Sequence, residues 1–151
     1  MVTSSPVNML SIWGKKKDEV IEIAISNTYR LFPPRILDIC SSYCGLSEEQ
    51  EFMHAVPKPV NKNRGNGIFI TTVNNINGAV SVFMPGVIQR LAELMGSDFY
   101  IGFLSMKAAV IHSSGLVSPE IVRDALKFQN DECNSEDFLS EKVYFYSRER
   151  D

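Results

Sequence analysis

The cysteines and histidines have the widest chemical repertoire of the side chains in this sequence, which has three of the first and two of the second. Cys40 and Cys44 would stand one turn apart on a helix and could present two thiolates to a metal, whereas Cys133 lies far along the chain. A zinc site needs four ligands and usually spaces paired cysteines by two residues, so His54 and His112 would have to complete it through folding. We therefore interpret the two cysteines as small apolar side chains of a buried helix face, and predict neither a metal nor a cofactor.

No pattern of residues marks a catalytic site. A cysteine nucleophile would need a histidine within hydrogen-bond reach, but neither histidine belongs to a recognisable motif, and the Gly-x-Ser-x-Gly turn of serine hydrolases is absent. General acid–base chemistry would then require a carboxylate, and Asp98, at an expected strand start, is the candidate. Its alternative role is that of a turn residue that accepts backbone N–H bonds. Because the pattern offers no second partner, the catalytic residues stay unassigned.

The segment from Lys58 to Gly67 concentrates basic residues and glycines, and it could hold a phosphate or another anion. Lys58, Lys62 and Arg64 would supply positive charge, and backbone N–H groups would supply hydrogen bonds. The segment lacks the Gly-Lys-Ser/Thr spacing that leads into a helix in nucleotide-binding loops. The alternative is a solvated connection between two elements.

Basic residues of this kind could also bind a nucleic acid weakly. A second basic run, Lys15-Lys16-Lys17, is followed at once by two acids. Tyr144 and Tyr146 alternate on the expected last strand, where they could stack on bases or pack across neighbouring strands. The formal net charge of −3 argues against a nucleic acid as the main partner.

Length and composition predict one soluble domain over residues 1–151, with a frayed lead-in at 1–8. The chain is 44% apolar and 22% charged, which is ordinary for a folded domain of this size. It lacks the cationic start and apolar run of a secretion signal, and no apolar run approaches the ~20 residues of a membrane span. With an odd number of cysteines, this predicts reduced thiols in a cytoplasm.

Hydrophobic periodicity divides the chain into N-terminal helices followed by alternating strands and helices. The predicted helices cover 17–32, 35–44, 48–55, 85–95 and 119–130, and the predicted strands cover 68–73, 79–84, 99–104, 108–112 and 142–147. Two hairpins among these strands imply a largely antiparallel sheet. The predicted fold is therefore α+β: helices, then a β-β-α-β-β-α-β sheet with helices packed on one face.

Local features refine this expectation at three places. The helix over 17–32 has an apolar side from Val20 to Phe32, and Ile23 does not fit that side. Trp13 is expected to anchor the preceding chain on the core. Asn77-Gly78 is expected to be an architectural turn with Gly78 at positive φ.

Several groups of residues, in a fixed order, resemble an uncharacterised family. They are Leu10–Gly14, Asn27–Pro34, Asn77–Ala79 with Pro85–Val87, Gly96–Ile101 and Leu139–Tyr146. The chain thereby resembles the C-terminal half of domain-of-unknown-function family 5688 from Gram-positive gut bacteria. Members tend to carry Ser-Ser-Ile-His-Glu after the position equivalent to Ile101, where this chain has Leu104-Ser105-Met106-Lys107-Ala108. The resemblance implies a bacterial protein of this fold class and supplies no activity.

The predicted function is that of a non-enzymatic interaction domain, which binds a partner protein or a second copy of itself and no membrane. The segment Phe103–Lys107 would cross a hairpin tip, where polar residues are usual, so Leu104 and Met106 are the predicted contacts. Equally, the strands could run straight through, and both residues would be ordinary core. A small enzyme with its site around Asp98 and the Lys58–Gly67 loop is the first alternative, and a weak nucleic-acid accessory factor is the second.

Overall fold

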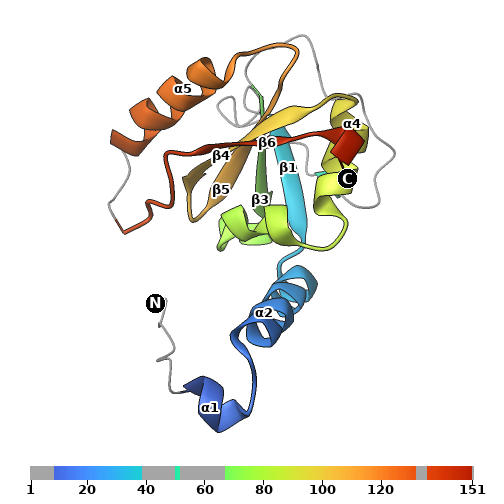
Figure 1. Ribbon diagram of the computed structural model, residues 1–151, viewed down its shortest axis with the longest axis vertical. Coiled ribbons are helices and arrows are strands. Elements are labelled where there is room, and N and C mark those ends of the chain that lie inside the picture. Colours follow the sequence, from blue (N-terminus) through green and yellow to red (C-terminus); the bar gives the residue numbers. More distant parts are fainter. Residues whose placement is uncertain (1–8, 39–49, 52–66, 132–135, 151) are drawn as a thin grey trace.

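The computed structural model describes residues 9–38, 50–51, 67–131 and 136–150 (Figure 1). Its elements in chain order are α1 (Met9–Trp13), α2 (Lys17–Leu31), β1 (Pro34–Asp38), β2 (Gln50–Glu51), β3 (Ile68–Thr72), the 3₁₀ helices η1 (Val73–Asn75) and η2 (Gly78–Phe83), α4 (Val87–Met95), β4 (Phe99–Ser105), β5 (Ala108–Ser113), α5 (Pro119–Asp131), β6 (Val143–Tyr146) and the 3₁₀ helix η3 (Arg148–Arg150). Within the described residues the strands form a six-stranded sheet in the order β2-β1-β3-β5-β4-β6. Every neighbouring pair is antiparallel. The predicted α+β class and antiparallel sheet are confirmed.

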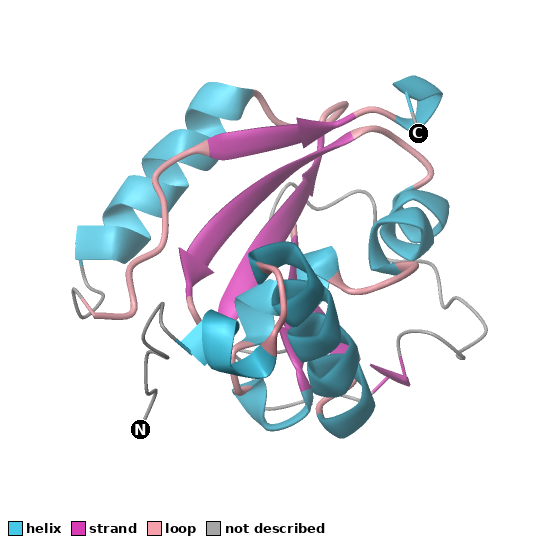
Figure 2. Cartoon of the chain, turned by 60° about the horizontal axis from the view of Figure 1, so that its bottom comes forward, coloured by secondary structure: helices cyan, strands magenta, loops and turns pink. Residues whose placement is uncertain are grey.

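The two faces of the sheet carry different cores, because successive side chains of a strand point to opposite sides. On β4, Phe99, Ile101 and Phe103 face the larger core, to which η2 and α4 also contribute. Val122 and Leu126 of α5 cover the other face in a smaller cluster. Figures 1 and 2 show α5 lying apart from α4 and the 3₁₀ helices. The helices are thus divided between the two faces, whereas the sequence predicted them on one.

Most other predicted elements are confirmed to within a few residues. The helices over 17–32, 85–95 and 119–130 appear as α2, α4 and α5, and the strands over 68–73, 99–104, 108–112 and 142–147 appear as β3, β4, β5 and β6. The first-turn signals of α5 are local, since Ser118 precedes Pro119 and its carbonyl accepts the N–H of Val122 at 3.3 Å.

The predicted helix over 35–44 is wrong in its described part. Residues Pro34–Asp38 form β1, which pairs with β3 along its whole length. A short apolar run such as Ile36-Leu37 fits a strand as well as a helix, so its period cannot decide between them. Pairing with β3 satisfies the backbone of this segment, and Ile36 packs on the larger core. Cys40 and Cys44 lie outside the described residues.

The predicted helix over 48–55 is also contradicted where the structure describes it. Gln50 and Glu51 form the short strand β2, which pairs with Ile36 and Arg35 of β1. Acidic residues in a first turn favour a helix only weakly. Pairing with β1 gives the backbone of Gln50 and Glu51 hydrogen bonds between strands in place of the bonds within a helix.

The predicted strand over 79–84 is wrong as well, since Gly78–Phe83 form η2. Asn77 adopts the left-handed conformation, with φ of 50°, and so turns the chain before a second strand could follow β3. Ala79 and Val82 are both buried, which fits the three residues per turn of a 3₁₀ helix. The Asn77-Gly78 turn exists, but its positive φ belongs to Asn77 and not to Gly78.

Gly78 is needed for close approach instead. A Cβ at this position would collide with the carbonyl oxygen of Lys107 and with Oγ1 of Thr71. Those two atoms are joined by a hydrogen bond of 2.7 Å, which the Thr71 hydroxyl donates. The adjacent N–H of Ala79 donates to the Met106 carbonyl at 3.1 Å. The start of η2 is therefore held against the turn between β4 and β5.

The helices α1 and α2 project from the rest of the molecule, at the bottom of Figure 1. Neither contains a buried residue. Only Ile25 and Tyr29 of α2 pack, partly buried, on the larger core. Trp13 is 48% exposed, so the predicted anchoring of Trp13 on the core is wrong.

Candidate functional site

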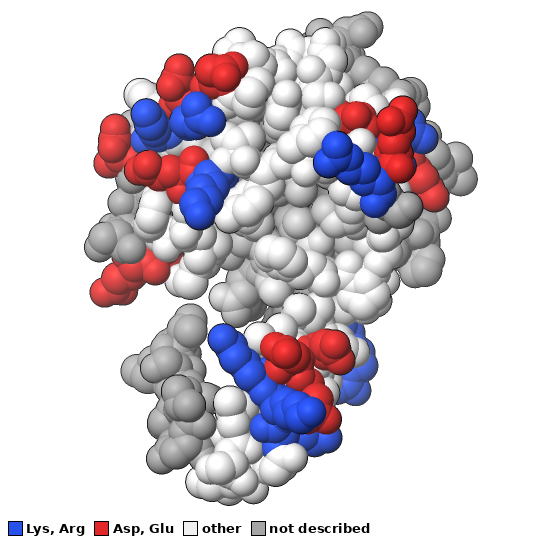
Figure 3. All heavy atoms as spheres, viewed as in Figure 1, with Lys and Arg blue, Asp and Glu red and all other residues white. Residues whose placement is uncertain are grey.

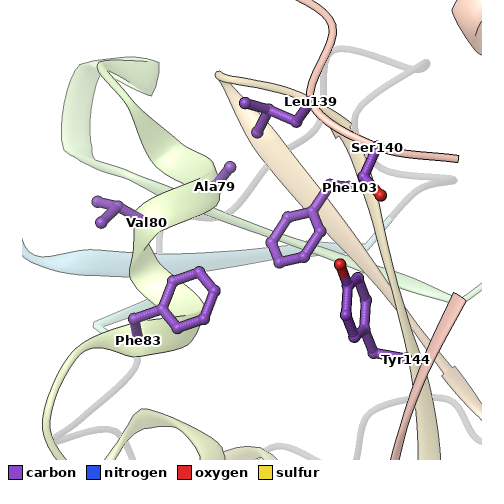
Figure 4. A pocket seen from close by; sticks show the side chains of 7 residues that line it. All are labelled: Ala79, Val80, Phe83, Phe103, Leu139, Ser140 and Tyr144. Atoms are coloured by element: carbon purple, nitrogen blue, oxygen red, sulfur yellow. The ribbon is translucent and has the colours of Figure 1, made fainter. Parts of the chain in front are cut away.

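An apolar groove of about 310 Å³ lies between η2 and the strands β4 and β6. Its walls come from three parts of the chain: η2, β4, and the segment that runs into β6 (Figure 4). The residues that line it are Ala79, Val80, Phe83, Phe103, Leu139, Ser140 and Tyr144. Ligand pockets in proteins start at about 300 Å³, so this groove can take one or two side chains of a partner or a small ligand.

Three aromatic rings organise the groove. Phe103 lies in the middle, with its ring centroid 5.9 Å from that of Phe83 and 5.6 Å from that of Tyr144. The Phe83 ring is stacked on Phe103, and the Tyr144 ring meets Phe103 edge-on. Phe103 is buried, whereas Phe83 is 61% exposed and Tyr144 44% exposed. The buried ring thus forms the floor, and the two exposed rings form opposite rims.

The groove opens on an uncharged part of the surface. Figure 3 shows acidic and basic side chains gathered near α5, near the C-terminal end and on α2, with neither kind over η2 and β6 between them. Among the lining residues the only polar side-chain groups are the hydroxyls of Ser140 and Tyr144. Such a surface favours apolar ligands and gives little attraction to ions.

The lining residues supply no acid–base pair, because none is an acid, a histidine or a lysine. Glu120, far from the groove at the start of α5, has a clear pKa shift. Its backbone hydrogen bond and a hydrogen bond with the Ser118 side chain lower the pKa of this fully exposed carboxyl. This shift reflects helix capping. No group of three or more metal-ligating side chains occurs within the described ranges.

Asp98 has a structural part in the fold. Its Oδ1 accepts the backbone N–H of Arg148 at 3.0 Å. Its carbonyl accepts the N–H and the hydroxyl of Ser114, at 3.0 and 3.1 Å. The Asp98 side chain thus accepts a backbone N–H, but from a residue fifty positions along the chain and not within a local turn, and these contacts fasten the chain after β6 to the sheet.

Leu104 and Met106, the predicted interface residues, lie at the tip of the β4–β5 hairpin and are both half-buried. Leu104 packs on the smaller cluster beneath α5, on the opposite face of the sheet from the groove. Met106 sits in the turn, where its N–H donates to the Asp137 carbonyl at 2.9 Å. The salt bridge of Lys107 with Asp137, at 3.3 Å, holds the same turn.

Tyr144 and Tyr146 pack across strands, on the face of the larger core. Tyr146 stacks on Phe99 with 4.8 Å between ring centroids, and Tyr144 meets Phe103. His112 is buried on β5, where Gly67 leaves room for its ring. The predicted anion ligands Lys58, Lys62 and Arg64 lie outside the described residues, as do Cys133 and His54.

The groove contains residues that sequence reasoning missed. Phe83 falls within the predicted strand over 79–84, and Leu139 falls outside every predicted element. The one available signal was Phe138-Leu139, an apolar pair in a segment otherwise typical of turns. That signal does not reveal which parts of the chain meet there, because the lining residues are spread from Ala79 to Tyr144 along the sequence.

Comparisons with known proteins agree with the resemblance seen in the sequence. No described helix is long and apolar enough to cross a membrane. No curated protein and no solved structure matches the chain. A family model matches residues 4–148, nearly the whole chain. The chain therefore belongs to the family of unknown function DUF5688.

Proposed function

We propose that this chain is a single, non-enzymatic protein-interaction domain, and that it binds an apolar side chain of a partner protein in the groove between η2, β4 and β6. The observation that carries the proposal is the exposure of Phe83 and Tyr144 on either side of a buried aromatic floor. Large aromatic side chains left in water around a concave apolar site are typical of binding surfaces.

The partner segment is extended and pairs with β6. This strand is the last in the sheet order, so within the described residues no strand pairs with its outer edge. An added strand gains main-chain hydrogen bonds along such an edge, while pockets for alternate side chains provide specificity. Tyr144 belongs both to β6 and to the groove, so an extended segment beside β6 can reach the groove with one side chain.

A selection of random peptides displayed on phage tests this function directly, with the purified chain as bait. We expect enriched peptides to share a large apolar residue and to lose at least about tenfold in affinity for Phe83→Ala, which corresponds to about 1.4 kcal/mol. The matched control is Phe128→Ala, since Phe128 is an exposed phenylalanine of α5, 69% accessible and far from the groove. Failure to enrich any peptide, or equal binding by the Phe83 and Phe128 variants, would contradict the proposal.

The interface hypothesis for Leu104 and Met106 concerns a second surface, since Leu104 lies on the other face of the sheet. The two alternatives are a small enzyme with its site around Asp98 and the Lys58–Gly67 loop, and a weak nucleic-acid accessory factor. No contact of the described residues favours either over binding in the groove.

We further propose a bacterial, cytoplasmic protein that corresponds to the C-terminal half of the longer family members. The odd number of cysteines supports a reducing compartment, because at least one thiol of a monomer stays unpaired. Fractionation of the native cells with a specific antibody tests this location. Recovery from the culture medium would contradict it.

A further inference from the structure

Residues 137–142 lead into β6 and form one wall of the groove, which we call the Leu139 wall. They adopt neither helix nor strand. They place Leu139 and Ser140 on the opposite side of the groove from Phe83 (Figure 4). Leu139 is 46% exposed, and the Ser140 hydroxyl accepts the N–H of Lys142 at 3.0 Å, a bond within the wall itself. The position of this wall therefore depends on what holds its two ends.

The two ends are held differently. At the end next to β6, Val143 pairs with Gly102 of β4 in the sheet. At the other end, the Asp137 carbonyl accepts the backbone N–H of Met106 at 2.9 Å. The Asp137 carboxylate also forms an ion pair with Lys107, at 3.3 Å from its Nζ. The β4–β5 turn thus holds the end of the Leu139 wall that the sheet does not.

The same turn holds the wall on the other side of the groove, which is η2. The Met106 carbonyl accepts the N–H of Ala79 at 3.1 Å. The Lys107 carbonyl accepts the Thr71 hydroxyl at 2.7 Å, at the point where Gly78 packs closely. Met106 therefore joins the two walls, since its N–H bonds to the Leu139 wall and its carbonyl bonds to η2. The position of this turn fixes how far apart the walls stand.

The two attachments differ in how much water reaches them. Gly78 and Ala79 are buried, so η2 is held where solvent does not compete. The ion pair is open to solvent, because the Lys107 side chain is 66% exposed and that of Asp137 is 21% exposed. Exposed ion pairs are weak, and salt screens them over a Debye length of about 10 Å at 0.1 M and about 3 Å at 1 M. The Leu139 wall is therefore held less firmly than η2, and its hold depends on salt.

We propose that the ion pair between Lys107 and Asp137 holds the Leu139 wall against an apolar side chain in the groove, so that screening or removing the pair weakens binding of an uncharged ligand. This inference rests on the proposed binding function of the groove. Neither residue lines the groove, so both are positioning residues that act through the wall. Screening does not act on contacts between uncharged groups, so an affinity that falls with ionic strength identifies the ion pair.

Hydrogen exchange of the Met106 amide tests the hold without any ligand, because this N–H is released when the end of the wall lifts from the turn. Lys107→Met, Asp137→Asn and sodium chloride at about 1 M should each lower its protection about two- to fivefold. Combining Lys107→Asp with Asp137→Lys should restore it. The Ala79 amide, which bonds to the same turn from η2, should keep its protection and is the internal control. Unchanged Met106 protection in both single variants, or an equal loss at Ala79, would overturn the inference.

Titration with N-acetyl-phenylalanine amide, an uncharged probe with a large apolar side chain, tests the consequence for binding. Its dissociation constant should rise about two- to fivefold in Lys107→Met, in Asp137→Asn and at high salt. Phe83→Ala should abolish binding, which places the probe in the groove. The matched control Glu93→Gln removes a 66% exposed carboxylate that pairs with Arg90 of α4 at 2.9 Å, and it should leave the affinity unchanged.

Failure of this inference and failure of the proposed function give different results. Equal probe affinity in the unchanged chain and in both ion-pair variants would mean that the groove binds without help from the pair, and would contradict this inference alone. Absence of binding even to the unchanged chain would contradict the proposed function of the groove, and this inference with it.

Discussion

The helices α4 and α2 show how differently two apolar helices of one chain can be used. Five of the nine residues of α4 are buried, whereas none of the 15 residues of α2 is. Both carry apolar residues at helical spacing, but α4 packs beside η2 into the larger core, whereas α2 touches the body through only part of one side. An apolar stripe thus predicts that a helix forms, and does not tell whether its own chain covers it. What stays uncovered is available for binding.

The largest expected difference in unfolding free energy is between two leucine substitutions, one in α4 and one in α2. Leu91 of α4 has no exposed surface, whereas Leu31 of α2 is 61% exposed. Leu91→Ala should cost about 2–5 kcal/mol of unfolding free energy, because it leaves a cavity in the larger core. Leu31→Ala should cost less than about 0.5 kcal/mol in the monomer. Urea unfolding measures both, and similar costs would show that α2 is buried against the body.

A smaller difference in unfolding free energy is expected between substitutions of two glycines, Gly78 at the start of η2 and Gly14 between α1 and α2. Gly78→Ala should cost about 1–3 kcal/mol by overpacking, since its Cβ would collide with Lys107 and Thr71. Gly14 has a φ of 61° and no neighbouring atom within 4 Å of a built Cβ. Gly14→Ala should therefore cost about 1 kcal/mol, from backbone strain alone. Thermal unfolding compares the two, and a neutral Gly78→Ala would mean that η2 is not held against the hairpin.

Elements with local sequence signals could be predicted, whereas elements that depend on distant parts of the chain could not. The β4–β5 hairpin follows from alternation over two adjacent segments, and α5 from the local signal Ser118-Pro119-Glu120. The strand β1 could not be predicted in this way, because each of its residues pairs with a residue of β3 that lies 30 to 38 positions further along the chain. The 3₁₀ helix η2 was missed because the left-handed turn at Asn77 changes the direction of the chain without changing the apolar pattern.

The candidate site was harder to predict than the fold, for a related reason. Tyr144 could be noticed as one of two alternating tyrosines on a strand. Phe83, Phe103 and Leu139 could not be connected to it, because they reach the groove from separate segments of the chain. The charged residues of the sequence indicate candidate sites at Lys58–Gly67 and Asp98, whereas the groove has no charged side chain in its lining. Apolar binding sites have the same composition as a core and differ from it only in exposure.

The hairpin tip is the region where the comparison between buried and exposed apolar residues is closest. Leu104 and Met106 are both half-buried. Leu104 packs on the smaller cluster beneath α5, so Leu104→Asp should destabilise the monomer by about 1–3 kcal/mol through burial of a polar group. Met106 lies in the turn, so Met106→Glu should cost less than about 1 kcal/mol.

Measuring association and melting temperature on the same two variants separates an interface from an ordinary core at this tip. An interface role predicts that Met106→Glu weakens binding of a partner, or of a second copy, at a nearly unchanged melting temperature. A purely structural role predicts unchanged association in both variants and a lower melting temperature for Leu104→Asp. Loss of soluble folded protein in both variants would sink the interface hypothesis, because a charge forced into a core unfolds a domain instead of only separating it from a partner.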